Sequence, residues 1–535
     1  MQLLPNPGHQ DGNETKTMIM AVVICLLVFI GFEWYRASSM PPPQQAEASS
    51  AAQTQQGQDL TPASLPSPQQ RNTYKLQTQY FDGAVNLQGG RLDELRFSEL
   101  DHPWFIPGGP HAQALDTGWL RGSPQTQEAD LFPNSRTQWT PQPDGSLRWT
   151  NAAGQIFERS FTQRDGTYVL EVTDTITNPT DTPLLVQHYA QLIRKNGAED
   201  GQFSNWLVHY GPLGWHPAGD DGLRVEVDYD DLQDAPYKTS ATGGWWGITT
   251  QYFMSALLAP TDAETRRQFY HTRQRDDDVY VALVQGDTVV VPAGETFSRT
   301  TPVYLGPKSE RLIEGVGHNL EEVIDYGWFH FMSAPMHDIL MWLYTYLGNW
   351  GWSIVVLTLF IKIITLPLTW HSMKAMAKLK ALQPEMTALQ ERYKDVEKGR
   401  EQMAMEMMSL YKEHKVNPVS GCWPVLIQMP VFFAMYKVLL ISYEIRGADF
   451  FWVPDLAVMD PYFILPLVMG ASMWLQMRLN PQPADPVQAK VMQYLPVIFT
   501  VMFLWFPAGL VLYWLTNNVL TIAQQYGMMV LEKKR

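Results

Sequence analysis

The stretch Val355-Val-Leu-Thr-Leu-Phe-Ile-Lys-Ile-Ile-Thr-Leu-Pro-Leu-Thr369 is the most direct indication of how this chain folds. It is apolar apart from its threonines and Lys362, and the segment 350–370 around it is long enough to cross the hydrocarbon core of a bilayer. An ammonium group near the middle of a bilayer costs about 2.5 to 3.5 kcal/mol on insertion scales. We therefore expect Lys362 to face protein or water and to have a function.

Four polar residues share one face of this predicted helix, three or four positions apart: Thr358, Lys362, Thr365 and Thr369. A second polar face is predicted within 509–529: Tyr513, Thr516, Asn517 and Gln524. The segment 420–441 adds Gln428. Two alternatives stay open for Lys362: its side chain extends to the membrane interface, or it only bonds neighbouring helices together.

Six segments are predicted to cross the membrane, because each is apolar over about the length that a bilayer requires: 18–35, 350–370, 420–441, 462–477, 491–506 and 509–529. We interpret 18–35 as an uncleaved anchor, with a cleaved signal peptide as the alternative. The segment 326–348 is predicted to be an amphipathic helix at the membrane interface.

Basic residues predict the orientation, since Lys and Arg concentrate in cytoplasmic loops. The segment 371–418 carries nine of them, whereas 442–461 has one basic residue, Arg446, against four acidic ones. We therefore place 371–418 in the cytoplasm and 442–461 in the periplasm. Six crossings then leave the termini, 1–17 and 530–535, and the loop 478–490 in the cytoplasm.

The residues between the first and second predicted crossings include a linker and a large domain. The linker, 36–71, is rich in Pro, Gln, Ala and Ser, and we expect it to be disordered. The domain, 72–325, shows strand patterns such as Tyr168 to Thr177, and 280–291 with 297–305 is predicted to form a hairpin around Pro292. Its size and short strands predict an all-β sandwich outside the membrane.

Composition excludes several classes of protein. The chain is 45% hydrophobic and 17% charged, and its net charge of −15 is concentrated in 72–325, which has 35 acidic and 19 basic residues. A uniformly acidic soluble enzyme is therefore disfavoured, and direct nucleic-acid binding is disfavoured because no basic stripe is present.

Motifs for catalysis, metals or cofactors are not found. The sequence has no zinc-type histidine pair, phosphate-binding loop, dinucleotide fingerprint or nucleophile elbow, so we predict no enzyme activity, no cofactor and no metal. Acidic runs such as Asp276 to Asp278 lack the ligand spacing of a calcium loop and are interpreted as solvated surface. Cys25 and Cys422 both lie in apolar runs, which argues against a disulfide framework and against lipidation of Cys25.

The cytoplasmic segment 371–418 is predicted to form a helical hairpin. Its apolar residues follow helical spacing on either side of Gly399: Leu379, Leu382, Met386, Leu389, Tyr393, Met403, Met407 and Leu410. Its many methionines could offer an adaptable surface to hydrophobic partners. A stripe at this spacing is more often a packed core, which we favour.

Motifs in the second half of the chain resemble those of the YidC family of membrane protein insertases in its Gram-negative form. The clearest are Asn349-Trp-Gly-Trp-Ser353, Pro367-Leu-Thr369, Gly421-Cys-Trp-Pro-Val-Leu-Ile-Gln-Met-Pro430, Asp460-Pro-Tyr-Phe-Ile-Leu-Pro466 and Phe503-Leu-Trp-Phe-Pro-Ala-Gly-Leu-Val-Leu-Tyr513. The resemblance covers nearly all of 325–525 and is looser in the β domain, where Asn86-Leu-Gln-Gly-Gly-Arg91 matches best. It implies a polytopic α-helical protein of the inner membrane, with a five-helix insertase core and a periplasmic β-supersandwich.

The resemblance also implies a mechanism. A hydrophilic groove, open to cytoplasm and lipid, draws in the polar segment of a newly made integral membrane protein, and the groove residues are Lys362, Thr358, Thr365, Gln428, Tyr513, Trp514 and Asn517. The client helix then moves into lipid along an apolar slide, for which the candidates are Phe432, Met469, Met502 and Phe506. Implied partners are the Sec translocon (SecYEG and SecDF), membrane lipids and, through the basic cytoplasmic segments, the ribosome or a targeting factor. One departure is that the bacterial family usually carries an arginine where this chain has Lys362.

Two other classes remain as alternatives. A secondary transporter could use Lys362 as a coupling site, but internal repeats and interrupted helices, which are common in such proteins, are not evident. An anchored sugar-binding or sugar-processing protein could rest on the β domain, but it leaves five predicted spans unexplained.

Overall fold

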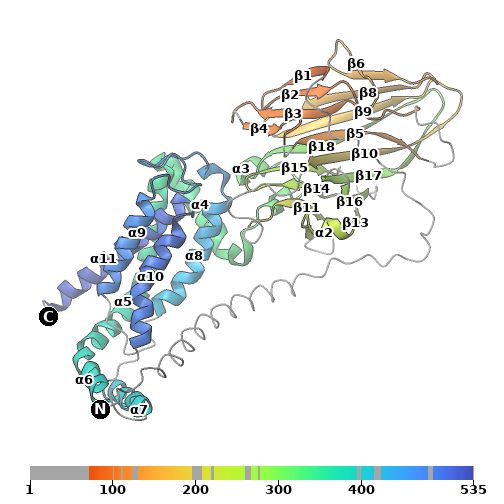
Figure 1. The fold of residues 1–535 in the computed structure, drawn as a ribbon. Coiled ribbons are helices and arrows are strands. Elements are labelled where there is room, and N and C mark those ends of the chain that lie inside the picture. The colour runs from red at the N-terminus through yellow and green to blue at the C-terminus, as the bar shows by residue number, and fades with distance from the viewer. Residues whose placement is uncertain are drawn as a thin grey trace, which may run out of the picture. The chain divides into compact units, whose positions relative to one another are not determined.

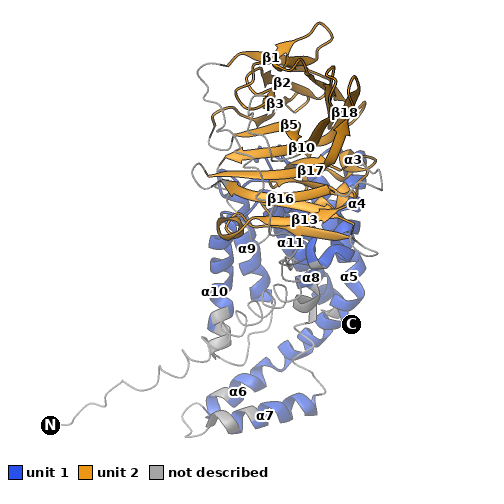
Figure 2. Cartoon of the chain, turned by 90° about the vertical axis from the view of Figure 1, so that its right-hand side faces the viewer, with its two compact units in different colours: residues 1–47, 326–440, 444–535 blue, residues 48–325, 441–443 orange. Residues whose placement is uncertain are grey.

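The computed structural model describes residues 71–533 apart from 101, 110–111, 123–130, 196–207, 218–221, 260–266, 275–277, 394–398, 415–422 and 480–485. The predicted anchor 18–35 and nearly all of the predicted linker lie outside the described residues. The chain divides into two compact units (Figure 2). The β unit runs to Asp325 and includes Ile441–Tyr443, and the helical unit comprises Tyr326–Leu440 and the residues from Glu444 onward.

The β unit consists of two nine-stranded antiparallel sheets (Figure 1). The first has the order β1-β2-β3-β5-β10-β17-β16-β13, with β4 paired to β3. Its strands are β1 (Thr73–Gln77), β2 (Phe81–Asn86), β3 (Arg91–Phe97), β4 (His102–Phe105), β5 (Gln113–Arg121), β10 (Leu184–Lys195), β13 (Tyr237–Ala241), β16 (Arg267–Gln274) and β17 (Val279–Val291).

The second sheet has the order β12-β11-β14-β15-β18-β9-β8-β7-β6. Its strands are β6 (Thr140–Pro141), β7 (Leu147–Thr150), β8 (Ile156–Gln163), β9 (Val169–Thr177), β11 (Gly211–His216), β12 (Leu223–Glu226), β14 (Trp245–Thr249), β15 (Phe253–Leu258) and β18 (Thr296–Pro307). Short helices accompany the sheets: α2 (Asp231–Asp234), α3 (Glu310–Ile313) and the 3₁₀ turn η1 (Leu320–Val323).

The alternating burial of side chains along β9 shows how the sequence determines which face of a strand enters the core. Its buried and half-buried side chains alternate from Val172 onward, as the pattern from Tyr168 to Thr177 predicts. Successive side chains of a strand point to opposite faces, so the apolar half enters the core between the sheets. Large aromatic residues, including Trp245 and Trp246, are fully buried there.

The predicted hairpin of 280–291 with 297–305 is wrong. β17 pairs with β10 and β16, whereas β18 pairs with β15 and β9, so the two consecutive strands belong to different sheets. The turn after Pro292 reverses the chain as expected, but it carries the chain across the core. Both edges of β17 and both edges of β18 are occupied by other strands, so neither has an edge left to pair with the other.

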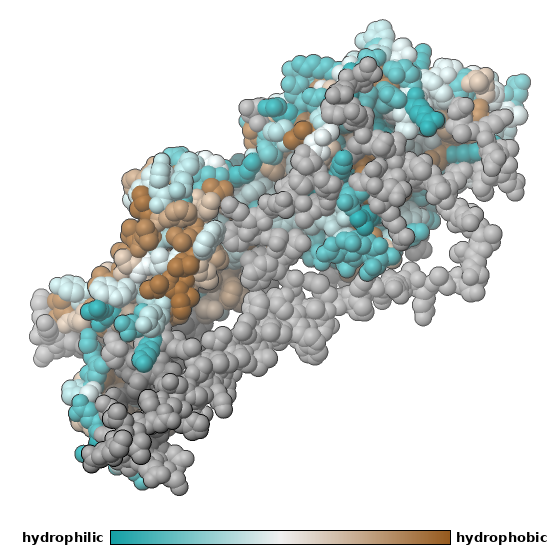
Figure 3. Space-filling model, in the orientation of Figure 1, coloured by the Kyte–Doolittle hydropathy of each residue, from teal (hydrophilic) through white to brown (hydrophobic). Residues whose placement is uncertain are grey.

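The helical unit consists of α-helices and short 3₁₀ turns (Figure 1). In chain order they are η2 (Gly327–Phe329), α4 (His330–Leu347), α5 (Trp350–Ala381), α6 (Gln383–Tyr393), α7 (Gly399–Glu413), α8 (Trp423–Ile441), η4 (Tyr443–Ile445, which begins in the β unit), α9 (Ile464–Leu479), α10 (Pro486–Phe503) and α11 (Ala508–Lys533). Among the described residues, α5 alone is both long and apolar enough to cross a membrane by length and composition. Shorter apolar stretches are Gln428–Ile441, Ile464–Leu479 and Met492–Phe503. Figure 3 shows a broad hydrophobic surface on these helices.

Helix α5 begins and ends at recognisable signals. The side chain of Asn349 accepts a hydrogen bond from the backbone N–H of Trp352 at 3.1 Å and caps the first turn. The helix continues past the predicted limit of 370 to Ala381, because no glycine or proline occurs between Pro367 and Pro384. Its last turns therefore belong to both the apolar helix and the predicted hairpin.

Candidate functional site

The polar stripe of α5 faces the interior of the helical unit over its first half. Thr358 is buried and Lys362 is only 7% exposed, whereas Ile364, two positions on, is 76% exposed. Thr365 and Thr369 are half-buried. The side of α5 that carries Lys362 packs against α11, so the lysine lies between helices while isoleucines cover the outside.

Lys362 is held by a residue that the sequence analysis did not name. Its Nζ donates a hydrogen bond to Oγ1 of Thr521 on α11, at 2.9 Å. The Thr521 hydroxyl in turn donates to the backbone carbonyl of Asn517 at 2.7 Å. Thr521 continues the four-residue spacing of Tyr513 and Asn517, and this was the signal that could have identified it.

The threonines of the stripe bond their own helix. Thr358, Thr365 and Thr369 donate to the backbone carbonyls of Ile354, Ile361 and Thr365, four residues earlier. Their hydroxyl protons are therefore used within α5. They give the face polarity, but Lys362 makes the link from this stripe to α11.

A second polar contact links α8 to α11. The amide Nε2 of Gln428 donates to the hydroxyl of Tyr513 at 2.7 Å. Further along α11, Nδ2 of Asn518 donates to Oγ of Ser472 on α9 at 3.0 Å. The structure thus brings Gln428 and Tyr513 together, and it adds Asn518 and Ser472, which the sequence analysis missed.

Trp514 lies in an aromatic cluster, which we define as Phe432, Phe499, Phe503, Phe506 and Trp514. Its ring centroid is 4.9 Å from that of Phe432, 5.5 Å from Phe503 and 5.8 Å from Phe499. Consecutive residues of a helix point about 100° apart, so Trp514 leaves the face that Tyr513 shares with Thr521.

The candidates for the apolar slide are not on one exposed face. Met469 is fully buried, and Phe432 and Phe506 are half-buried within or beside the aromatic cluster. Met502 is 41% exposed on α10. Three of the four, Met469, Phe432 and Phe506, thus help to pack the helices, and Met502 is the most accessible.

The apolar helices of this unit contain basic residues but almost no acidic ones. The sequences of α5, α8, α9 and α10 contain no Asp or Glu, and α11 has none before Glu532. Within the described residues, no carboxylate lies within ion-pair distance of Lys362. The interior site therefore offers a positive charge without an internal countercharge.

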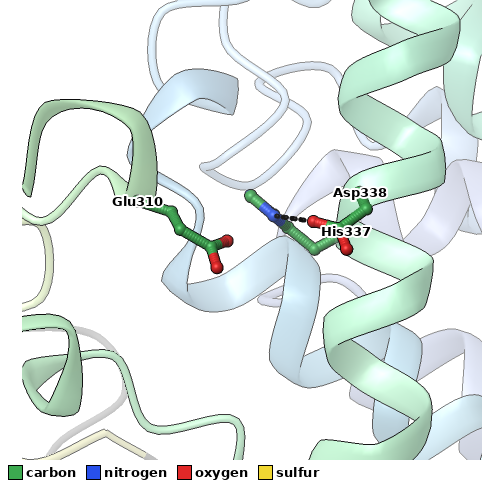
Figure 4. A group of neighbouring side chains, drawn as sticks. All are labelled: Glu310, His337 and Asp338. Carbon is green, nitrogen blue, oxygen red and sulfur yellow. Dashed lines mark ion pairs between the residues drawn. The ribbon is translucent and has the colours of Figure 1, made fainter. Parts of the chain in front are cut away.

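A separate group of titratable residues lies on α4 (Figure 4). Nδ1 of His337 is 3.9 Å from Oδ1 of the exposed Asp338, and its Nε2 is 3.9 Å from Glu444. Figure 4 also draws Glu310, which belongs to the β unit. The pair on α4 is a weak, partly solvated contact, and we assign no metal site to it.

Comparisons with known proteins agree with these features. Residues 342–535 match the family model "60Kd inner membrane protein", and residues 73–339 match "YidC periplasmic domain". A membrane protein insertase YidC of Magnetococcus marinus is 37% identical over 514 residues, covering 92% of this chain and 89% of that protein. Another, of Paraburkholderia xenovorans, is 38% identical over 489 residues, covering 87% of this chain and 85% of that protein.

Among solved structures, an active YidC insertase with its first transmembrane domain resolved aligns with 85% of this chain and 92% of its own. The TM-score is 0.38 at 17% identity, so the sequence matches carry the assignment. They confirm the family suggested by the motifs, its periplasmic β-sandwich with a helical C-terminal region, and its non-enzymatic character, and they do not favour a transporter. The chain belongs to the YidC family of membrane protein insertases.

Proposed function

We propose that this chain inserts newly made integral membrane proteins into the inner membrane, with Lys362 as the residue that attracts the polar segment of a client. The observation that supports this most directly is the place of Lys362: it is buried between α5 and α11 and bonded to a neutral hydroxyl, and the only carboxylate in the sequences of these two helices is Glu532 in the last turn of α11. An unneutralised charge in a low-dielectric setting attracts an opposite charge more strongly than the same charge in water does.

The proposed step lowers a desolvation barrier. A polar client segment leaving water for lipid loses hydrogen bonds, at a cost of several kcal/mol for each unsatisfied backbone group. Lys362, the Gln428–Tyr513 pair and Asn517 would offer replacement partners part-way across the membrane. The apolar helix of the client then moves into lipid past Met502, and burial of its apolar surface drives the transfer. No nucleotide is required for this step.

The topology that we propose has six crossings with both termini in the cytoplasm. The anchor 18–35 is the first, and α5, α8, α9, α10 and α11 contain the remaining five. The β unit and 442–461 are then periplasmic, and α6 with α7 is cytoplasmic. Helix α4 lies at the outer interface, which its exposed side chains Phe331, Trp342 and Tyr346 favour.

The proposed partners follow from this arrangement. Membrane lipids contact the exposed apolar residues of α9 and α10, such as Val468 and Ile498. The Sec translocon (SecYEG and SecDF) would act beside the chain for some clients. The ribosome or a targeting factor would meet the basic segments of the cytoplasmic face, because positive segments are attracted to RNA phosphates.

The test compares two clients that differ only in acidic residues before their first helix. At matched insertase levels, Lys362→Arg should retain insertion of both clients, since the charge is kept. Lys362→Ala should lower insertion of the acidic client roughly tenfold or more, which corresponds to about 1.4 kcal/mol, and affect the neutral client less. Insertion is measured by protease protection of radiolabelled client in inverted vesicles.

Site-specific crosslinking from position 362 to stalled nascent chains is the second measurement, and it should capture the polar segment of the client. Equal insertion of both clients by Lys362→Ala, at wild-type efficiency, would contradict the electrostatic role. A loss of protein abundance that is independent of client charge would indicate instead that Lys362 is a structural link between α5 and α11.

A further inference from the structure

The contact between Lys362 and Thr521 has a directional chemistry. An ammonium group has three N–H donors and no acceptor, so it can bond Thr521 only by donating to the hydroxyl oxygen. The hydroxyl proton is therefore free to be donated elsewhere, and it goes to the carbonyl of Asn517 at 2.7 Å. This bond within α11 orients the oxygen lone pairs of Thr521 toward Lys362, at 2.9 Å.

The neutrality of this partner is as important as its geometry. Lysines buried in proteins are ordinarily paired with a carboxylate, because an unpaired charge is expensive to bury. Here one N–H donates to an uncharged oxygen, and among the described residues the other two donors of Lys362 have no partner, so the positive charge and these two donors can act on a ligand. A carboxylate at position 521 would hold Lys362 at least as firmly, but it would cancel most of the field that a client meets.

We propose that Thr521 is the positioning residue of Lys362 and that its lack of charge makes the groove selective for acidic client segments. The inference rests on the proposed function, because Thr521 can affect selectivity only if the charge of Lys362 attracts clients. It predicts two separable effects: removal of the hydroxyl weakens attraction, and addition of a carboxylate abolishes selectivity.

The experiment uses the full chain in inverted vesicles with the same acidic and neutral clients. Thr521→Val keeps the shape and removes the hydroxyl, and it should lower insertion of the acidic client by roughly three- to tenfold, which is within the range for the net contribution of a typical hydrogen bond. Thr521→Ser restores a hydroxyl and should stay within about twofold of the wild type. Thr521→Glu should bring the ratio of acidic to neutral client insertion to about one, because the new carboxylate pairs with Lys362. Its neutral counterpart, Thr521→Gln, should keep the preference for the acidic client.

Thr500 on α10 supplies a matched control. Its hydroxyl donates to the carbonyl of Pro496 at 2.7 Å, the same four-residue backbone bond that Thr521 makes. Among the described residues, Lys362 bonds Thr521 and not Thr500. Thr500→Val should therefore leave the ratio between the two clients unchanged. All variants are compared at equal amounts of membrane-embedded protein.

The outcomes distinguish the inference from the proposed function. If Lys362→Ala does not affect the acidic client selectively, both the proposed function and the inference are overturned. If Lys362→Ala does so but Thr521→Val and Thr521→Glu behave as the wild type, the inference alone is overturned. In the double variant Lys362→Ala/Thr521→Val, a loss no larger than that of Lys362→Ala supports action through Lys362, and an additive loss overturns it.

Discussion

Asp174 in the β unit shows how a single buried residue can link two sheets. Its carboxylate accepts from Nε of Arg159 at 2.7 Å within its own sheet and from Nε2 of His188, on β10 of the other sheet, at 3.0 Å. Arg159 also donates to the carbonyl of Gly90 at 2.7 Å. Burial would raise the pKa of Asp174, but the Arg159 guanidinium and the His188 bond lower it to about 2. Burial also lowers the pKa of His188, although Asp174 opposes this.

These shifts predict that the β unit loses stability in mild acid. His188 has a lower pKa in the folded state than in the unfolded chain, so below about pH 6.5 the unfolded state binds more protons and is favoured. Asp174 also favours the unfolded state, below about pH 4, because its carboxylate takes up a proton in the unfolded chain while the folded one stays ionised to about pH 2. We expect the urea midpoint of the β unit to fall between pH 8 and pH 5, and to fall less in His188→Gln.

The measurement is pulse proteolysis of the detergent-solubilised full chain across that pH range. His330 is the control position, because it is exposed and belongs to the helical unit rather than to the β unit. A midpoint that is flat from pH 8 to pH 5, or that falls equally in His188→Gln and the wild type, would refute the prediction.

At the scale of elements, the hairpin of α6 and α7 has a small core that it shares with the end of α5. The buried residues Leu379, Leu382, Met386 and Met407 form one cluster. The hydroxyl of Tyr411 reaches the sulfur of Met386 at 3.9 Å. Met408, next to Met407 on α7, is 57% exposed, so adjacent methionines face the core and the solvent. The interpretation of the stripe as core is therefore supported for Met386 and Met407.

This arrangement predicts a large effect on stability for one substitution and almost none for its neighbour. Met407→Ala should destabilise the hairpin by about 2–4 kcal/mol, the range for truncating a buried methionine, and should accelerate proteolysis between α6 and α7. Met408→Ala should change stability by less than about 0.5 kcal/mol. Limited proteolysis of inverted vesicles compares the two, and equal cleavage rates would argue against a packed hairpin core. Reduced client crosslinking in Met408→Ala, with wild-type proteolysis, would add a client contact at the exposed methionines.

At the scale of the whole molecule, charge and apolar surface are segregated. The domain 72–325 carries the negative charge of the chain, whereas basic residues gather between α5 and α8. Large apolar side chains are exposed on α5, α9 and α10, as expected for helices that contact lipid. Such a distribution favours one orientation in the membrane, because basic segments remain in the cytoplasm.

Protease added to spheroplasts tests this orientation. We expect digestion within 72–325 and in 442–461, and protection of the stretch from Lys374 to Lys415 until the spheroplasts are lysed. The fragments are identified by antibodies against the two regions. Cleavage between Lys374 and Lys415 in intact spheroplasts would overturn the proposed topology, and an inaccessible β unit would do the same.

The sequence by itself determined the family, the division into β and helical parts, and the polar faces of α5 and α11. These depend on local periodicity and on motifs, which each segment carries wherever it packs. The tertiary structure decided which elements meet. A turn after Pro292 specifies that the chain reverses but not that β17 and β18 join different sheets. Likewise, the spacing along α11 places Thr521 on the polar face, but its pairing with Lys362 depends on the rotation and depth of α11 beside α5.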